Sequence, residues 1–235
     1  MRRLNMSREI KFKALLIISV LAPLFLFSHA SAASAAKWFS FNKRDALAEW
    51  QEKIFKGKVF YSIKMEKMGG YLAAYSKNAA SGILYEISFS PRKYPVVSWK
   101  WKVIQFPQES AGQHSAGRWI EKDDYATRFY VIFPAFFFTN TKSLEYVWDK
   151  YLPEGTVMTS PYYRNIKIIV AESGEKNLGK WVSEKRNIYE DFKKAFGRAP
   201  GHVGAIAIMT DTDNTISTAE ADYDEIKVGY KDGEN

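Results

Sequence analysis

Four side chains that could bind a ligand together alternate with large apolar residues near the middle of the chain: Glu86, Lys100, Arg128 and Tyr130. An acid, two cations and a phenol on one surface can hold hydroxyls or an anionic group through charge-assisted hydrogen bonds. The same set can also form cross-strand ion pairs on a solvated face, which fix strand register and need no further use. Both interpretations stay open from the sequence.

The elements expected to position these groups are three strands, Ile83–Phe89, Val97–Val103 and Tyr125–Phe133. Each alternates apolar and polar residues with period two, which is typical of a sheet with one buried and one accessible face. If the three strands share a sheet, the four polar side chains lie together on its accessible face. Replacing Arg128 with alanine would then abolish ligand binding while leaving the melting temperature nearly unchanged.

Aromatic side chains offer a second kind of contact, because ring faces suit the C–H face of a sugar. Trp99 and Trp101 share the phase of the apolar residues around them and are therefore predicted to be core. Better platform candidates lie elsewhere, although each could instead pack in the interior: Trp119, Trp148, Tyr162 and Tyr163. The long loop Pro107–Trp119, rich in small residues, is expected to close over the ligand.

A metal is not predicted as a cofactor, but one segment offers hard oxygen ligands. Asp211, Asp213 and Asn214 are closely spaced, and calcium accepts such ligands. A calcium loop needs glycine at its sixth position, where this chain has Ile216. An oxygen-rich turn that caps its own backbone is the alternative, and it is favoured.

Catalytic residues are not predicted, because no candidate nucleophile has an activating partner. The histidines His29, His114 and His202 form no plausible metal or triad cluster. Two enzymatic alternatives remain. Glu86 with Asp123 or Asp124 could hydrolyse a polysaccharide, and Tyr130 beside Arg128 or Lys100 could act as the base of a lyase on uronic acids.

The N-terminus predicts export to the periplasm or the medium. Basic residues precede the apolar stretch Ala14–Ser28, and Ala30–Ala35 supplies small-residue cleavage sites, so residues 1–35 read as a cleavable signal peptide. Retention as an anchor is the alternative; once the signal is removed, no integral membrane span is expected. Residues 36–235 then form one domain with 29 basic and 25 acidic residues, and without a basic cluster of the nucleic-acid-binding type.

The expected fold is mainly β, a two-sheet antiparallel sandwich of jelly-roll type with one or two short peripheral helices. Helices are expected at Ala46–Phe55, ended by Gly57, and at Tyr189–Phe196, ended by Gly197. The chain has no cysteine, so the core alone must hold the fold. Oligomeric state is left open.

Four blocks in order carry a resemblance to a known family: ASGILYEI, YPVVSWKWKV, KDDYATRFYVIF, and GAIAIMTDTDNT with AEADYDEI. From about Trp50 to Val228 the chain resembles the bacterial exported family known as domain of unknown function 3047. That family implies no activity. The chain is also similar, at the level of fold, to jelly-roll carbohydrate-binding modules, through the string Tyr223–Ile226.

Three functions therefore remain in view. The leading one is an exported non-catalytic domain that binds a saccharide or another polar or anionic envelope ligand on a sheet face. The second is a polysaccharide lyase or hydrolase on the same face. The third is a structural or partner-binding envelope module that uses the apolar segment Phe136–Phe138.

Overall fold

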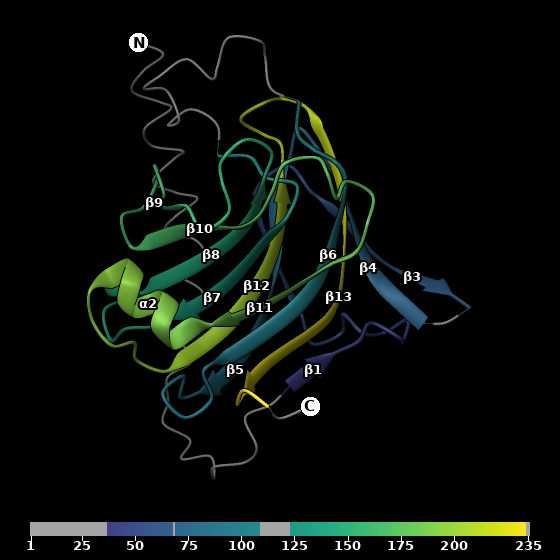
Figure 1. Cartoon of the computed structure of the whole chain (residues 1–235). Helices are drawn as coiled ribbons and strands as arrows, with labels where there is room; N and C mark the ends of the chain where they lie inside the picture. The colour runs from purple at the N-terminus through teal and green to yellow at the C-terminus, as the bar shows by residue number, and fades with distance from the viewer. Residues whose placement is uncertain (1–36, 68, 109–122, 234–235) are drawn as a thin grey trace, which may run out of the picture.

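Two β-sheets stacked face to face make up the molecule, and a helix lies at one side (Figure 1). The computed structural model describes residues 37–67, 69–108 and 123–233. The predicted signal peptide, Trp119 and most of the loop Pro107–Trp119 lie outside these residues. Within the described ranges, no helix is long and apolar enough to cross a membrane.

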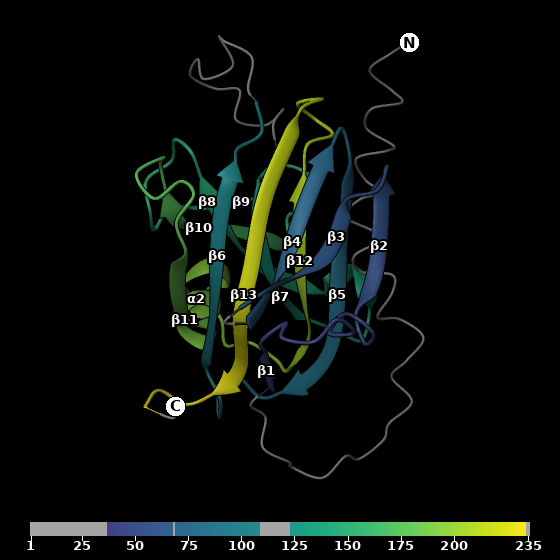
Figure 2. The ribbon, with the colours of Figure 1, turned by 90° about the vertical axis from the view of Figure 1, so that its right-hand side faces the viewer.

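The six-stranded sheet has the order β11-β6-β13-β4-β3, with β1 also paired to β13, and all of its pairs are antiparallel. Figure 2 shows β6, β13 and β4 side by side in this layer. Its strands are β1 (Lys37–Phe39), β3 (Phe60–Glu66), β4 (Gly69–Lys77), β6 (Val96–Gln105), β11 (Val182–Asn187) and β13 (Thr218–Tyr230).

The seven-stranded sheet has the order β2-β5-β12-β7-β8-β10-β9, and only β8 and β10 run parallel among its described pairs. Its strands are β2 (Gln51–Lys56), β5 (Ala80–Phe89), β7 (Arg128–Phe133), β8 (Lys142–Asp149), β9 (Val157–Thr159), β10 (Ile166–Ser173) and β12 (Val203–Asp211). The prediction of a two-sheet sandwich is confirmed.

Large aromatic side chains fill the space between the sheets. Trp99 of β6 stacks on Phe129 of β7 with ring centroids 4.5 Å apart and also contacts Tyr146 of β8 at 5.2 Å. Trp101 lies 6.3 Å from Trp148 by the same measure. Both tryptophans of β6 are therefore core, as their phase predicted, and such buried aromatic contacts contribute strongly to stability.

One of the two predicted helices forms. Helix α2 (Ile188–Phe196) begins at Asn187, whose side chain accepts the backbone N–H of Glu190, and ends at Gly197 with φ of 68°. The helix expected at Ala46–Phe55 is wrong. Tight i to i−3 turns replace its first half, and Gln51–Lys56 becomes β2 because this segment pairs with β5. A short 3₁₀ turn, η2 (Phe138–Asn140), lies between β7 and β8.

Candidate functional site

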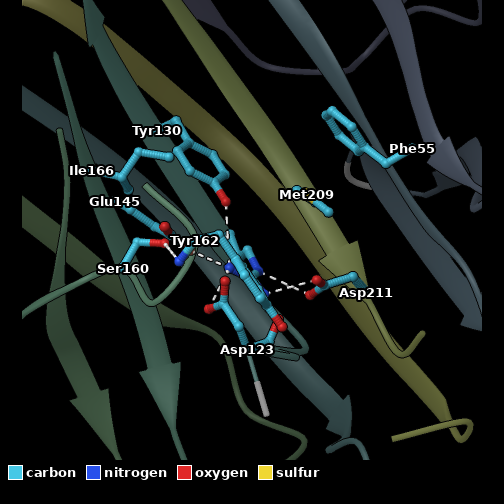
Figure 3. Close-up of a pocket in the computed structure, with 10 residues that line it drawn as sticks. Phe55, Asp123, Tyr130, Glu145, Ser160, Tyr162, Ile166, Met209 and Asp211 are labelled. Carbon is cyan, nitrogen blue, oxygen red and sulfur yellow. Dashed lines mark hydrogen bonds and ion pairs between the residues drawn. The ribbon is translucent and has the colours of Figure 1, made fainter. Parts of the chain in front are cut away.

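A small pocket lies on the outer face of the seven-stranded sheet, the face turned away from the other sheet (Figure 3). Its volume is about 40 Å³. One water needs roughly 10–15 Å³ on this measure, so the pocket has room for about three water-sized groups. Its lining is polar from Asp123, Arg128, Tyr130, Glu145, Ser160, Tyr162 and Asp211, and apolar from Phe55, Ile166 and Met209.

Strand parity brings the polar groups to this face. On β7, Phe129, Val131 and Phe133 join the core between the sheets, so Arg128 and Tyr130 point the other way. In the β7–β8 pairing Tyr130 stands directly opposite Glu145. In the β7–β12 pairing Arg128 stands opposite Met209, and Asp211 lies further along β12.

The guanidinium of Arg128 organises the site. It donates a bidentate pair of hydrogen bonds to Asp211, with Nε–Oδ1 at 2.9 Å and Nη2–Oδ2 at 2.8 Å. Nη1 donates to Asp123 Oδ1 at 3.1 Å and to Glu145 Oε1, and it lies 3.4 Å from the hydroxyl of Tyr130. Nη2 also donates to the backbone carbonyl of Asp123. Arginine has five N–H donors, and all five are used within the protein.

The charge balance of this cluster is negative when all groups are ionised. One guanidinium faces the carboxylates of Asp123, Asp211 and Glu145, and all four side chains are buried. Burial raises the pKa of Glu145 to about 7, against the opposing effect of Arg128. Glu145 is therefore partly protonated near neutral pH and can either donate or accept a hydrogen bond.

The two phenols at the pocket are neutral groups. Burial raises the pKa of Tyr130 well above its ordinary value, despite the nearby guanidinium, and burial also raises the pKa of Tyr162. Tyr130 is therefore protonated at neutral pH.

The predicted constellation is assembled in part. Glu86, Arg128 and Tyr130 share the outer face of the seven-stranded sheet, but Glu86 does not line the pocket and instead accepts from Gln51 at 3.3 Å. Lys100 was expected beside them, and this is wrong. Its strand β6 belongs to the other sheet, where Lys100 forms an exposed ion pair with Glu225 at 2.8 Å.

The picture of an accessible, solvated face also needs correction. Arg128 has a relative exposure of 2% and Glu145 of 1%. The set is thus a buried ionic network, whose charges lose hydration and are compensated by one another. Removing Arg128 is consequently expected to destabilise the fold, contrary to the expectation from sequence.

Among the aromatic platform candidates that the structure describes, only Tyr162 lines the pocket. Trp148 is wrong as a platform because its side chain is fully buried in the core and its indole N–H donates to the carbonyl of Gly174 at 2.9 Å. Tyr163 donates to the carbonyl of Thr139, away from the pocket. Trp119 lies outside the described residues.

The acidic turn after β12 is built into the same region. Carboxylate oxygens of Asp124, Asp211 and Asp213 lie within 4.8 Å of one another. Asp124 accepts the backbone N–H groups of Asn214 and Thr215, at 3.3 and 2.6 Å, while Asp211 serves Arg128. The Asn214 amide donates to Tyr162 at 2.9 Å. The backbone of this turn is therefore capped by Asp124 from a remote segment of the chain, and not by the turn's own carboxylates as the sequence had predicted.

Sequence reasoning missed Glu145 and the apolar pocket residues Phe55 and Met209. A usable signal existed for Glu145, because Leu144 and Tyr146 flank it with the period-two alternation of a strand. No comparable local signal marks Met209, which lines the pocket only because β12 lies between β5 and β7.

Comparison with known proteins places the chain in a family. The model of a family described as protein of unknown function (DUF3047) matches residues 48–227. The chain belongs to this family. No curated protein matches it.

Solved structures of similar shape include carbohydrate-binding modules. The family 11 module of a cellulosomal cellulase of Clostridium thermocellum matches with a TM-score of 0.45 and 12% identity, over 85% of this chain and 97% of that one. The family 30 module of another cellulosomal cellulase of that organism gives a TM-score of 0.43 and 7% identity, over 79% and 93%. Likeness at this level assigns no ligand to this member of the DUF3047 family.

Proposed function

We propose that this DUF3047 protein is an exported, non-catalytic binding domain that takes the hydroxyl-bearing edge of a neutral saccharide into the pocket around Arg128. The observation that carries the proposal is the pocket itself. A buried guanidinium holds three acidic side chains and a phenol in fixed positions at its wall. Pre-positioned polar groups in a small cavity are typical of sites that orient a ligand.

Hydroxyl groups fit both the chemistry and the size of this pocket. Carboxylates are strong acceptors for O–H donors, and the phenols of Tyr130 and Tyr162 can donate or accept. Room for about three water-sized groups suits two or three neighbouring hydroxyls of one sugar ring. The remainder of the ligand would lie along the sheet face.

A neutral ligand is favoured over an anionic one. Arg128 has no N–H left for a ligand, because its five donors are used within the protein. A ligand carboxylate would instead meet the side chains of Asp123, Asp211 and Glu145, which repel it in their ionised forms because like charges at close range repel. The pocket thus argues against the anionic part of the sequence-based expectation and against uronic acids.

The apolar side of the site suits the carbon face of a sugar. A second, smaller cavity of about 20 Å³ adjoins the first and shares Phe55, Tyr130 and Met209 with it. Its exposed lining is entirely apolar. Aromatic and aliphatic contacts beside a few fixed polar groups form the usual lining of a small-molecule site.

Export forms part of the proposal and is supported by the signal-like segment at residues 1–35. A domain that binds saccharide would meet its ligand in the periplasm or outside the cell. Retention of the apolar segment Ala14–Ser28 in the secreted protein, read by N-terminal sequencing, would contradict the cleavage step.

Binding is tested by replacing one phenol at a time. Tyr162→Phe removes a pocket hydroxyl and keeps the ring, and loss of one such hydrogen bond of about 1 kcal/mol lowers affinity roughly fivefold. Tyr163→Phe is the matched control, since that hydroxyl bonds Thr139 outside the pocket. Isothermal titration with neutral oligosaccharides found on a glycan array is the measurement. Equal affinities for the two variants, or no binding by any neutral glycan, would refute the proposal.

A further inference from the structure

A cluster of exposed phenylalanines follows β7 at the end opposite to Arg128. Arg128 begins β7, whereas Phe136, Phe137 and Phe138 follow its other end. Their relative exposures are 97%, 64% and 38%. We call these three residues the Phe tip. Contiguous exposed apolar side chains mark interaction surfaces, and the saccharide site makes no use of this one.

The Phe tip is held by hydrogen bonds at its base. The backbone N–H groups of Asn140 and Thr141 donate to the carbonyls of Phe137 and Phe138, at 2.8 and 3.0 Å. The side-chain amide of Asn165 donates to the carbonyl of Thr139 at 2.9 Å. The chain thus presents its phenylalanines on a defined turn supported by the start of β10.

Four cations lie near one another beside the base of the Phe tip: Lys142, Arg164, Lys167 and Arg198. Lys142 begins β8 and donates to Asn165 at 3.1 Å, and Asn165 in turn donates to Thr139 at the base of the tip. The ammonium groups of Lys142 and Lys167 lie 5.0 and 5.9 Å from the ring centroid of Phe196, at the end of α2. None of the four forms an ion pair with an acidic group within the described part of the chain.

The cations are also close enough to act on one another. Burial, followed by repulsion from Arg198, Arg164 and Lys167, lowers the pKa of Lys142. A group of mutually repelling cations gains stability when an anionic surface comes near. An apolar tip with such cations beside its base matches the two components of interfacial membrane binding, buried apolar area and attraction to anionic lipid.

We propose that the Phe tip docks this protein onto a bilayer containing anionic phospholipid, with Phe136 and Phe137 entering the interface and the four cations facing the headgroups. Each Lys or Arg near an anionic membrane surface contributes about 1 kcal/mol, or roughly fivefold in partitioning. The pocket of the saccharide site would stay open, since its residues are not part of the tip. The two activities are therefore separable.

The absence of cysteine from the chain allows a local test. Phe137→Cys, labelled with the environment-sensitive dye NBD, is mixed with vesicles of phosphatidylcholine and phosphatidylglycerol or of phosphatidylcholine alone. Phe60→Cys, labelled in the same way, is the matched control, because Phe60 is equally exposed at 65% but lies on β3 of the other sheet. The dye reports only the surroundings of the residue that carries it, so contact of another segment with the vesicle does not change the signal.

The expected result is a blue shift and a several-fold rise in emission at position 137 with the anionic vesicles and none at position 60. Arg164→Gln together with Arg198→Gln should weaken this partitioning roughly 25-fold, without changing saccharide affinity. No change at position 137, or an equal change at both positions, would overturn the proposal. So would equal binding to the two kinds of vesicle.

Discussion

Replacing Arg128 with methionine should destabilise the fold strongly. Methionine keeps much of the side-chain volume and removes the charge, so Asp123, Asp211 and Glu145 lose their shared cation in a site where Arg128 is 2% exposed. Breaking a buried ion pair by removing one partner costs about 3–5 kcal/mol. For a domain of this size each kcal/mol lowers the melting temperature by about 2–4 °C, which gives a fall of about 6–20 °C.

The assay is urea unfolding followed by tryptophan fluorescence, together with a thermal melt. Lys100→Met is the control, because Lys100 and Glu225 form an ion pair whose side chains are 38% and 44% exposed, and such pairs contribute about 0–1 kcal/mol. A second variant tests the cause. Arg128→Met combined with Asp211→Asn and Glu145→Gln should recover part of the loss, because two of the three unpaired carboxylates are gone.

A loss below about 1 kcal/mol for Arg128→Met, similar to that for Lys100→Met, would refute this reasoning. Such a result would mean that the guanidinium is solvated, as the sequence alone had suggested. Failure of the triple replacement to recover stability would show that packing around Arg128, and not its charge, explains the loss.

Three further predictions concern stability. Burial raises the pKa of Glu145 from 4.5 to about 7, so the stability that Glu145 contributes is fully present below pH 4.5 and is lost as the pH rises through 7. Across this window the free energy of unfolding of the wild type should fall by up to about 3 kcal/mol relative to that of Glu145→Gln. Parallel pH profiles of the two proteins in urea unfolding would contradict this prediction. Gly82→Ala places a Cβ 2.8 Å from the carbonyl oxygen of Ile208 and should cost about 1–3 kcal/mol, whereas Gly201→Ala, with nothing within 4 Å, should stay within about 0.5 kcal/mol; equal melting temperatures would refute the packing argument. Asn187→Ala removes the N-terminal cap of α2 and should lower the free energy of unfolding by about 1 kcal/mol. An unchanged melting temperature would show that the cap bond does not contribute to stability.

The alternation of side chains was enough to predict which residues of each strand face the core. Phe129 and Trp99 pack between the sheets, and Arg128 and Tyr130 face outward, as period two requires. Alternation does not determine which sheet a strand joins. Lys100 was therefore grouped with residues that lie on the opposite side of the sandwich.

The ionic network around Arg128 depends on contacts between residues that are remote in the chain. Arg128 and Asp211 are 83 residues apart, and they meet because β12 is paired beside β7. The local sequence does not indicate that pairing, and it does not indicate that Arg128, on the polar side of its strand, is buried. The segment Gln51–Lys56 shows the same limit, because pairing with β5 outweighs its helical pattern.

The most direct test of the proposed saccharide site uses its methionine. Met209 lines both adjoining cavities, and Met65, which is 46% exposed on β3 of the other sheet, serves as an internal reference. The protein is labelled with ¹³C at the methionine methyl groups, and its spectrum is followed while neutral oligosaccharides are added. A saturable shift of the Met209 signal, with Met65 unmoved, is the result predicted here. An unmoved Met209 signal with a bound glycan, or a shift at Met65 instead, would contradict the location of the site.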